Sequence, residues 1–252
     1  MKEKNIRLTI AYNGNMFSGW QRQKNEDSIQ EAIEKALKKI IGENIKVIGC
    51  GRTDSKVHAI SYTANFQTTS HLAPEQIEKA LNSLLPTDIH IKKTEVASSE
   101  FHSRYSAKKK TYRYLIICGQ KSPFLQNFAY YIRDTLNIDY MKKATEHFLG
   151  EHDFSAFQAA GSNILNSKRK IYRIVVREEK FTIDSELKII SIEITANGFL
   201  YKMARNIVGT LIYVGLGKLS VKKVAGLIAS RDRRQAPPTA PPEGLYLKKV
   251  VY

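Results

Sequence analysis

Residues 49–59 bring one carboxylate and one guanidinium together in a short polar segment between two apolar, β-prone runs. The segment reads Gly-Cys-Gly-Arg-Thr-Asp-Ser-Lys-Val-His-Ala, so that Arg52 lies two residues before Asp54. In a tight connection between strands, two such side chains can project to one side and meet the same ligand. The alternative is an ordinary hairpin, because Gly, Asp, Ser and Lys are common turn residues. The spacing alone favours the hairpin, so evidence for an active-site loop has to come from other parts of the chain.

A second arginine with chemical potential is Arg205, within Asn197-Gly-Phe-Leu-Tyr-Lys-Met-Ala-Arg-Asn-Ile-Val-Gly209. The apolar residues that follow it have helical spacing and predict that this helix packs into a core. A buried guanidinium needs a carboxylate partner. The alternative is an arginine on a solvent-exposed helix face.

The charge of the chain points to a polyanionic partner. Its 252 residues include 40 Lys and Arg against 24 Asp and Glu, a formal net charge of +16. Such an excess favours nucleic acid through counterion release and electrostatic steering, although a solvated basic surface is the alternative. No apolar run approaches the roughly 18 residues of a membrane-spanning helix, and the first residues lead directly into a strand-like alternation. We therefore expect a cytoplasmic protein with no membrane partner.

Neither a disulfide nor a metal site is expected. Cys50 and Cys118 are the only cysteines, far apart and outside any C-x-x-C pattern, and are expected to be buried thiols. His147 and His152 flank Gly150, which interrupts the helix that metal ligands would require. The fragment of a phosphate-binding loop at Gly215-Leu-Gly-Lys218 is incomplete, so no nucleoside triphosphate site is expected.

The periodicity predicts an α+β fold built from two ferredoxin-like (split βαβ) halves with a cleft between them. Strand, helix, strand, strand, helix and strand follow one another over residues 6–96, including a Ser28-Ile-Gln-Glu31 capping box and a helix between Pro74 and Pro86. A similar order recurs from residue 111, with helices expected at 138–149, at 201–215 and after Ser220, and a last strand from Leu245. The predicted halves are residues 1–105 and 106–252.

Several segments, in order along the chain, resemble one enzyme family. Gly51-Arg-Thr-Asp-Ser-Lys-Val-His-Ala59 is similar to the signature loop of the tRNA pseudouridine synthase A family. The likeness extends to Tyr12-Asn-Gly14, Ser18-Gly-Trp-Gln-Arg-Gln23, Phe101-His-Ser-Arg104, Tyr112-Arg-Tyr114, Arg205-Asn-Ile-Val-Gly209 and Glu243-Gly-Leu-Tyr-Leu247. It implies a homodimeric, cofactor-free isomerase that converts uridine to pseudouridine in the anticodon stem-loop of tRNA, at positions 38, 39 or 40.

The resemblance also assigns roles to residues. It implies that Asp54 is the catalytic carboxylate, that Arg52 lies against the RNA backbone and that Arg205 ion-pairs with Asp54. It implies that Tyr112 stacks on the target uracil and that Leu245 packs around the flipped base. Taken alone, Tyr112 is equally well explained as a tyrosine packed in a β core, because Tyr is common in strands.

The chain departs from the family signature at Lys56, where the family has glycine. A turn that needs a positive φ at this position would cost a lysine roughly 1 kcal/mol. We interpret Lys56 as the mark of a divergent member, such as a paralogue whose RNA target differs. Further candidates for RNA contact are His58, Lys108, Lys109, Lys110, Lys168 and Arg169, although a run of charges is more often simply solvated.

Three other hypotheses remain open at this stage. One is a non-catalytic RNA-binding or chaperone protein, and another is a pseudouridine synthase that acts on a different RNA such as rRNA. Retention of both Asp54 and Arg205 disfavours a pure binder, because a buried ion pair is costly to keep. A sheet-surface RNA reader is disfavoured because its aromatic signature does not occur in the chain.

Overall fold

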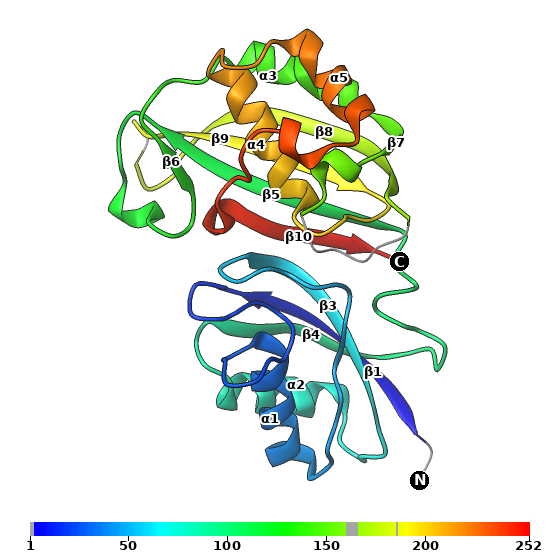
Figure 1. Cartoon of the computed structure of the whole chain (residues 1–252). Coiled ribbons are helices and arrows are strands. Elements are labelled where there is room, and N and C mark those ends of the chain that lie inside the picture. The colour runs from blue at the N-terminus through cyan, green and yellow to red at the C-terminus, as the bar shows by residue number, and fades with distance from the viewer. Residues whose placement is uncertain (1–2, 160–165, 185) are drawn as a thin grey trace. The chain divides into compact units, whose positions relative to one another are not determined.

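The computed structural model describes residues 3–159, 166–184 and 186–252, which form two compact units (Figure 1). The first unit comprises Met1–Lys108 with Tyr246–Tyr252, and the second comprises Lys109–Leu245. The sequence division at residue 105 did not anticipate that the end of the chain returns to the first unit. The cause is strand β10 (Leu245–Val251), whose Tyr246 and Leu247 pair in parallel with His58 and Ala59.

The first unit is an antiparallel sheet with two helices on one face (Figure 1). Strand β1 lies between β4 and β3, and β2 pairs with the other edge of β3. This is the strand order of a ferredoxin-like unit. The elements are β1 (Lys4–Tyr12), α1 (Ile29–Ile41), β2 (Ile48–Gly49), β3 (His58–Thr68), α2 (Pro74–Leu84) and β4 (Ile89–Ala97).

Both helices of the first unit begin and end where the sequence predicts. Ser28 caps α1 by accepting a hydrogen bond from the backbone N–H of Glu31, and Gly42 ends the helix with a left-handed φ of 83°. Helix α2 starts at Pro74 and ends before Pro86, and it buries Ile77 and Leu81. Leu84, the last residue of this helix, is apolar but 50% exposed.

The second unit repeats this design with additional elements. Its sheet has the order β5-β9-β8-β7, antiparallel throughout, and β6 runs parallel to β5. The helices cover one face of this sheet (Figure 1). The elements are β5 (Lys109–Cys118), β6 (Tyr130–Ile132), α3 (Ile138–Thr145), β7 (Gly150–Asp153), β8 (Lys168–Lys180), β9 (Lys188–Ala196), α4 (Met203–Gly215) and α5 (Val221–Ser230).

Details of the second unit differ from the sequence prediction. Strands β6 and β7 were not expected, and α3 gives way to a 3₁₀ turn after Thr145 instead of continuing to residue 149. Ser220 occupies the N-cap position of α5 but makes no capping hydrogen bond with its side chain. In the described part of this unit, 3₁₀ turns span Pro123–Leu125, Glu146–Phe148, Ser155–Phe157, Arg233–Gln235 and Pro242–Gly244.

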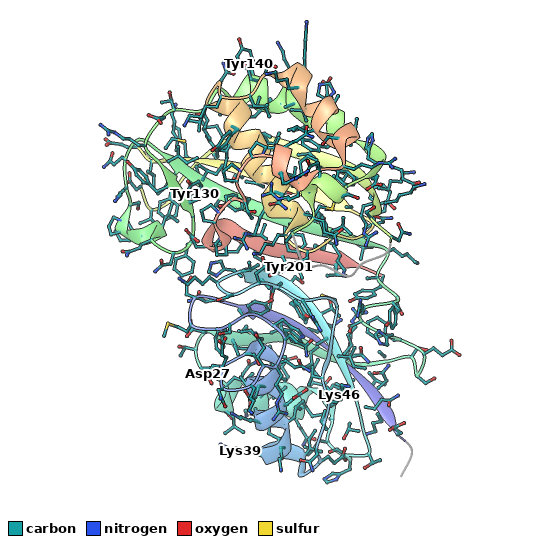
Figure 2. All side chains as sticks on the ribbon, in the orientation of Figure 1. Asp27, Lys39, Lys46, Tyr130, Tyr140 and Tyr201 are labelled. Atoms are coloured by element: carbon teal, nitrogen blue, oxygen red, sulfur yellow. The ribbon has the colours of Figure 1, made fainter. Side chains whose placement is uncertain are left out.

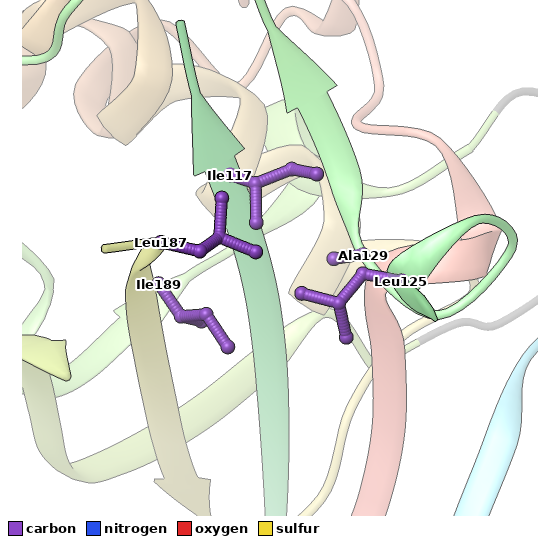
Figure 3. Close-up of a cluster of buried hydrophobic side chains, with 5 residues drawn as sticks. All are labelled: Ile117, Leu125, Ala129, Leu187 and Ile189. Atoms are coloured by element: carbon purple, nitrogen blue, oxygen red, sulfur yellow. The ribbon is translucent and has the colours of Figure 1, made fainter. Parts of the chain in front are cut away.

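The two faces of the second sheet have different characters. The helix-covered face holds Tyr114, Ile116, Ile192 and Ile194, all buried. Thr111 and Arg113 alternate with these residues and contact Thr195, Glu193 and Glu179 on the opposite face, which we call the open face. At one end of the open face, the residues before and within β6 cover a separate apolar cluster (Figure 3) of Ile117, Leu125, Ala129, Leu187 and Ile189.

The prediction of an α+β fold with two ferredoxin-like halves is therefore confirmed. Cys50 is a buried thiol as expected, whereas the thiol of Cys118 is only half-buried. Within the described ranges, no helix is long and apolar enough to cross a membrane.

Candidate active site

Asp54 lies in the connection between β2 and β3, as the sequence predicts. Within this loop the N–H of Val57 donates to the carbonyl of Asp54 at 3.2 Å, which closes a four-residue turn. The side chain of Asp54 is half-buried, while those of Arg52 and Lys56 are exposed. The loop thus presents one carboxylate between two exposed cations.

Lys56 adopts the conformation that the sequence analysis anticipated for a glycine position. Its φ is 64°, in the left-handed region, and it is the third residue of the Asp54–Val57 turn. An L residue pays roughly 1 kcal/mol for this conformation. The family glycine would avoid that cost, and Lys56 instead adds an exposed cation two residues from Asp54.

The loop rests on a second segment, Asn13–Trp20, whose two glycines allow very close backbone contact. Gly19 has a φ of 96°, and a Cβ added there would lie 2.4 Å from the carbonyl oxygen of Thr53. A Cβ added to Gly14 would lie 2.1 Å from the carbonyl oxygen of Val57. These distances are shorter than any real Cβ contact, so only glycine fits at either position. We call this supporting segment, Asn13–Trp20, the bed of the Asp54 loop.

Hydrogen bonds hold the loop to this bed and the bed to α1. The N–H of Trp20 donates to Thr53 O at 3.2 Å, and the Ser55 hydroxyl donates to Phe17 O at 3.2 Å. On the other side of the bed, the N–H groups of Ile29 and Gln30 donate to the carbonyls of Gly19 and Trp20. The first turn of α1, which follows Asp27 (Figure 2), therefore satisfies its unpaired donors with the bed itself.

Three aromatic residues fill the space under the loop. Trp20 stacks on Tyr62 with a centroid separation of 4.0 Å, and Tyr12 lies 5.7 Å from Tyr62. Tyr62 donates its hydroxyl proton to Gly51 O at 2.5 Å, and the hydroxyl groups of Tyr12 and Thr53 are 2.8 Å apart. Trp20 is buried, so it supports the loop from below and is not an RNA-facing ring.

His58, expected as an RNA contact, is only 1% exposed. Its Nδ1 accepts a hydrogen bond from the N–H of Gly14 at 3.1 Å, and its ring stacks on Tyr246 at 4.7 Å. A side chain enclosed in this way packs the bed against the sheet. We therefore withdraw His58 from the RNA contacts.

In the second unit, Arg205 is buried on α4, a helix in which every residue but Tyr213 is buried. Its side chain is 9% exposed. Its Nε donates to the carbonyl of Ala240 at 2.7 Å, and the N–H of Ala240 donates to Arg205 O at 3.1 Å. The burial expected from the helix periodicity is thus observed, and the guanidinium is oriented by a loop carbonyl. Asp54 belongs to the other unit.

Tyr112 lies on β5, on the helix-covered side, where it pairs with Ile194 of β9. Its ring is half-buried and meets Phe199 edge to face, with centroids 4.9 Å apart. Phe199 precedes α4 closely, as does the exposed Tyr201 (Figure 2). An edge-to-face neighbour fixes the plane of the Tyr112 ring.

Tyr114 is a residue of this region that sequence reasoning did not single out. Its hydroxyl donates to Pro241 O at 2.8 Å. Burial raises its pKa well above the usual value, and the charge of Glu243 raises it further, whereas the charge of Arg205 lowers it. Arg205 and Glu243 therefore lie close enough to Tyr114 for their charges to act on its hydroxyl. A Cβ on Gly244 would lie 2.7 Å from the Tyr114 ring, so the residues just before the buried Leu245 pack directly on this tyrosine.

The expected phosphate contacts have different environments. Lys108, Lys109 and Lys168 are exposed and Lys110 is half-buried. Arg169 is half-buried, and its Nη1 donates to the carbonyls of Asn166 and Lys168. Burial lowers the pKa of Arg169. In the described part of the chain, no three His, Cys, Asp or Glu residues come close enough together to hold a metal ion.

Comparison with known proteins identifies the family. The tRNA pseudouridine synthase family profile matches residues 8–106 and 144–252. The tRNA pseudouridine synthase A of Ruminiclostridium cellulolyticum is 47% identical over 252 residues, and those of Caldicellulosiruptor bescii and Thermoanaerobacter sp. (strain X514) are 46% and 44% identical over 250 residues. Each alignment covers 99% of this chain and 100% of the relative.

Solved structures resemble the chain only weakly. The archaeal box H/ACA sRNP Nop10-Cbf5 complex aligns with 83% of this chain and 42% of its own, at 12% identity and a TM-score of 0.34, which is too low to support an argument. The family therefore rests on the sequence matches, which span both units. The chain belongs to the tRNA pseudouridine synthase family, whose members are enzymes that isomerise uridine to pseudouridine.

Proposed function

We propose that this chain isomerises uridines at positions 38, 39 or 40 in the anticodon stem-loop of tRNA, with Asp54 as the carboxylate that acts on the target nucleotide. The observation that carries the proposal is the bed under the Asp54 loop. Two glycines, four backbone-directed hydrogen bonds and three buried rings hold a half-exposed carboxylate on an otherwise polar loop. Such rigid support is what catalytic groups need, because it avoids reorganisation during the reaction.

The reaction requires one bond to break and one to form at the same sugar carbon. The bond between uracil N1 and C1′ is cleaved, the base rotates, and C5 becomes bonded to C1′ while the proton of C5 is released and N1 gains one. An ionised carboxylate can assist the cleavage either as a nucleophile or as a base that removes the 2′ proton. We assign this task to Asp54, and both routes are compatible with a carboxylate on an exposed turn.

We propose that Arg205 is the ion-pair partner of the ionised Asp54 carboxylate. A buried guanidinium is costly unless it is paired, and the Nε of Arg205 already donates to Ala240 O.

We propose that Tyr112 stacks on the target base. Phe199 fixes the plane of the Tyr112 ring, and stacking of a base on such a ring contributes about 1 to 3 kcal/mol. That gain offsets the few kcal/mol needed to flip a base out of a stem. Leu245 would then pack against the flipped base, and Arg52 would contact the RNA backbone.

The open face of the second unit adds a candidate phosphate-binding surface at Lys109, Lys170 and Tyr172. Tyr172 is the extra residue of a β-bulge in β8 and is 41% exposed. The Nζ atoms of Lys109 and Lys170 lie 4.7 Å and 5.9 Å from its ring centroid. Among the described residues neither lysine forms a salt bridge, so their charges are available to phosphates. Further candidate phosphate contacts outside this surface are Lys108, Lys110, Lys168 and Arg169. Together, these charges would give a strongly salt-dependent affinity for RNA.

The proposed target is tested by mapping pseudouridines in tRNA transcripts treated with the purified chain. We expect modification at one or more of positions 38, 39 and 40 and at no other uridine of the same transcript. Modification confined to rRNA fragments would contradict the tRNA assignment. Binding without any modification would support the alternative of a non-catalytic RNA-binding protein.

The proposal includes a homodimer in the cytoplasm, as the sequence resemblance implies. A tRNA is large relative to one 28.6 kDa chain, which favours a symmetric pair of subunits. Light scattering of the purified chain tests the dimer directly. A mass equal to one chain at micromolar concentration, with and without tRNA, would rule it out.

A further inference from the structure

Arg233 and Arg234 are neighbours in the chain with very different surroundings. The guanidinium of Arg233 makes four hydrogen bonds inside the second unit: Nη1 donates to Ala236 O (2.9 Å) and Pro237 O (3.0 Å), and Nη2 donates to Thr239 Oγ1 (3.0 Å) and Asn206 Oδ1 (3.2 Å). The side chain of Arg234 is 91% exposed and, among the residues that the structure describes, pairs only with the nearby Asp232. Arg233 therefore has a task within the fold that Arg234 does not share.

That task concerns residues 236–241, which we call the proline segment. It contains three prolines, which have no N–H to donate, and it belongs to no strand or helix. Its carbonyls are therefore the main means of fixing its path. Arg233 binds those of Ala236 and Pro237, Arg205 binds that of Ala240, and Tyr114 binds that of Pro241.

The proline segment lies directly against α4. A Cβ on Gly209 would come within 2.1 Å of Pro238 O. The hydroxyl of Thr239 donates to Asn206 Oδ1 at 2.6 Å, and the side-chain amide of Asn206 donates to Phe157 O at 2.6 Å. Asn206 is fully buried and held from both sides, so it is a fixed point for the segment.

Two adjacent residues of α4 thus bind two adjacent residues of the proline segment. Asn206 binds Thr239, and Arg205 binds Ala240 through both its Nε and its backbone carbonyl. Arg233 contacts both Thr239 and Asn206, one residue away from the contact that orients the Arg205 side chain. If the contacts of Arg233 are lost, the Thr239 side chain keeps its own hydrogen bond to Asn206 Oδ1, but the position of the neighbouring Ala240 carbonyl becomes less well defined.

We propose that Arg233 is a positioning residue for Arg205: by fixing the proline segment, it keeps the Ala240 carbonyl where it orients the Arg205 guanidinium. This inference rests on the proposed function, in which Arg205 partners Asp54. Arg233 does not act on the substrate itself. A residue that only stabilised the fold would affect melting and leave the rate of a folded variant unchanged.

The test compares Arg233→Met with Arg234→Met, a matched control at the adjacent exposed arginine. The rate of tritium release from tRNA labelled at uracil C5 is measured in single turnover, well below the melting temperature of each variant, and tRNA affinity is measured by filter binding. We expect Arg233→Met to lower the rate about 10- to 100-fold, because small displacements of a catalytic constellation have effects of this size. Its affinity for tRNA should stay within about two-fold of wild type, and Arg234→Met should match wild type in rate to the same degree.

Arg233→Lys supplies a conservative comparison. An ammonium can bind some of the four acceptors but cannot reproduce the planar fork that reaches all of them. We therefore expect a rate between those of wild type and Arg233→Met. If Arg233→Met does not fold, Thr239→Val carries the test, because it removes one link of the same network, and a several-fold lower rate is expected.

Two outcomes separate this inference from the function on which it rests. A folded Arg233→Met, or in its place Thr239→Val, with the wild-type rate would show that Arg233 only stabilises the protein, and the inference would be wrong. Arg205→Met is the reference: if it kept the wild-type rate, the proposed role of Arg205 itself would fail. An inactive Arg205→Met beside a fully active Arg233→Met would reject the positioning role alone.

Discussion

The Asp54 loop is supported mainly by close glycine contacts, whereas the surroundings of Arg205 are held mainly by side-chain hydrogen bonds. In the first unit, the loop lies on Gly14 and Gly19 at distances that no side chain would tolerate. In the second unit, arginine, asparagine and tyrosine side chains bind the proline segment, and Gly209 of α4 adds one close contact with it. A glycine contact is broken by adding atoms, and a side-chain contact is broken by removing them. The substitutions that displace the catalytic groups should therefore differ between the two regions.

The largest effect is expected from adding one carbon at Gly19. Gly19→Ala places Cβ against Thr53 O in a backbone conformation with φ of 96°, and we expect a loss of about 2 to 4 kcal/mol of stability and of most activity. Thermal unfolding and tritium release measure the two effects. Gly42→Ala is the matched control, because Gly42 also has a positive φ of 83° but open space around its Cβ position.

Gly42→Ala should cost about 1 kcal/mol and leave the rate of a folded protein unchanged. If Gly19→Ala behaved like this control, the bed would not determine the position of the Asp54 loop. Close glycine contacts would then not explain how the Asp54 loop is held in place.

An intermediate effect is expected from two tyrosines, the buried Tyr114 in the second unit and the half-buried Tyr252 in the first. Tyr114 donates to Pro241 O and Tyr252 donates to Ser103 O, each at 2.8 Å. Burial is the main cause that raises the pKa of both, with Glu243 and Cys50 respectively as the next causes. A phenol whose pKa is raised by folding stabilises the fold below the unfolded pKa of about 10, and this contribution is lost as the pH rises above that value.

We therefore expect the free energy of unfolding to fall above about pH 10, by up to about 1.4 kcal/mol per pH unit for each group. Tyr114→Phe and Tyr252→Phe should each flatten this slope, as measured by denaturant unfolding across the alkaline range. Tyr140→Phe removes the hydroxyl from an exposed ring (Figure 2) and should leave the slope unchanged. Equal slopes in all four proteins would contradict the assignment of these buried hydroxyl groups.

The smallest effect is expected at Lys56. Lys56→Gly removes the strain of a left-handed lysine, but glycine loses more chain entropy on folding, so the net gain should be below about 1 kcal/mol. We expect the rate or the choice of uridine to change while tRNA binding changes little. Asn25→Gly is a suitable control, since Asn25 has a φ of 62° and asparagine tolerates this region. A large fall in affinity for Lys56→Gly alone would instead show that this cation binds RNA.

The sequence was sufficient for the elements that bury a periodic apolar face. Helix α1, with Ser28 and Gly42 at its ends, and the alternating strands β1, β3 and β5 are where their patterns predict them. Strands β6 and β7 were missed because segments of three and four residues are too short to show a period. These strands form by pairing with β5 and β8, and such pairing cannot be recognised from the residues of the short strands themselves.

The candidate site was predictable to a smaller extent. The burial of Arg205 follows from its apolar helix, but three of the four acceptors of Arg233 lie in the proline segment, which has no periodicity. His58 was misassigned because a histidine beside a polar loop reads as a surface residue, whereas Gly14 N–H and Tyr246 enclose it. The roles of Gly14 and Gly19 could not be derived either, since the close contact arises between two loops that are more than 30 residues apart.

The central claim is that Asp54 acts on the nucleotide from a loop whose shape does not depend on its charge. Asp54→Asn keeps the size of the side chain and removes the ionised carboxylate. The most direct test is single-turnover tritium release by this variant, with tRNA binding and melting measured on the same preparation. We expect no detectable release, with affinity and melting temperature close to wild type. Release at the wild-type rate would contradict the account.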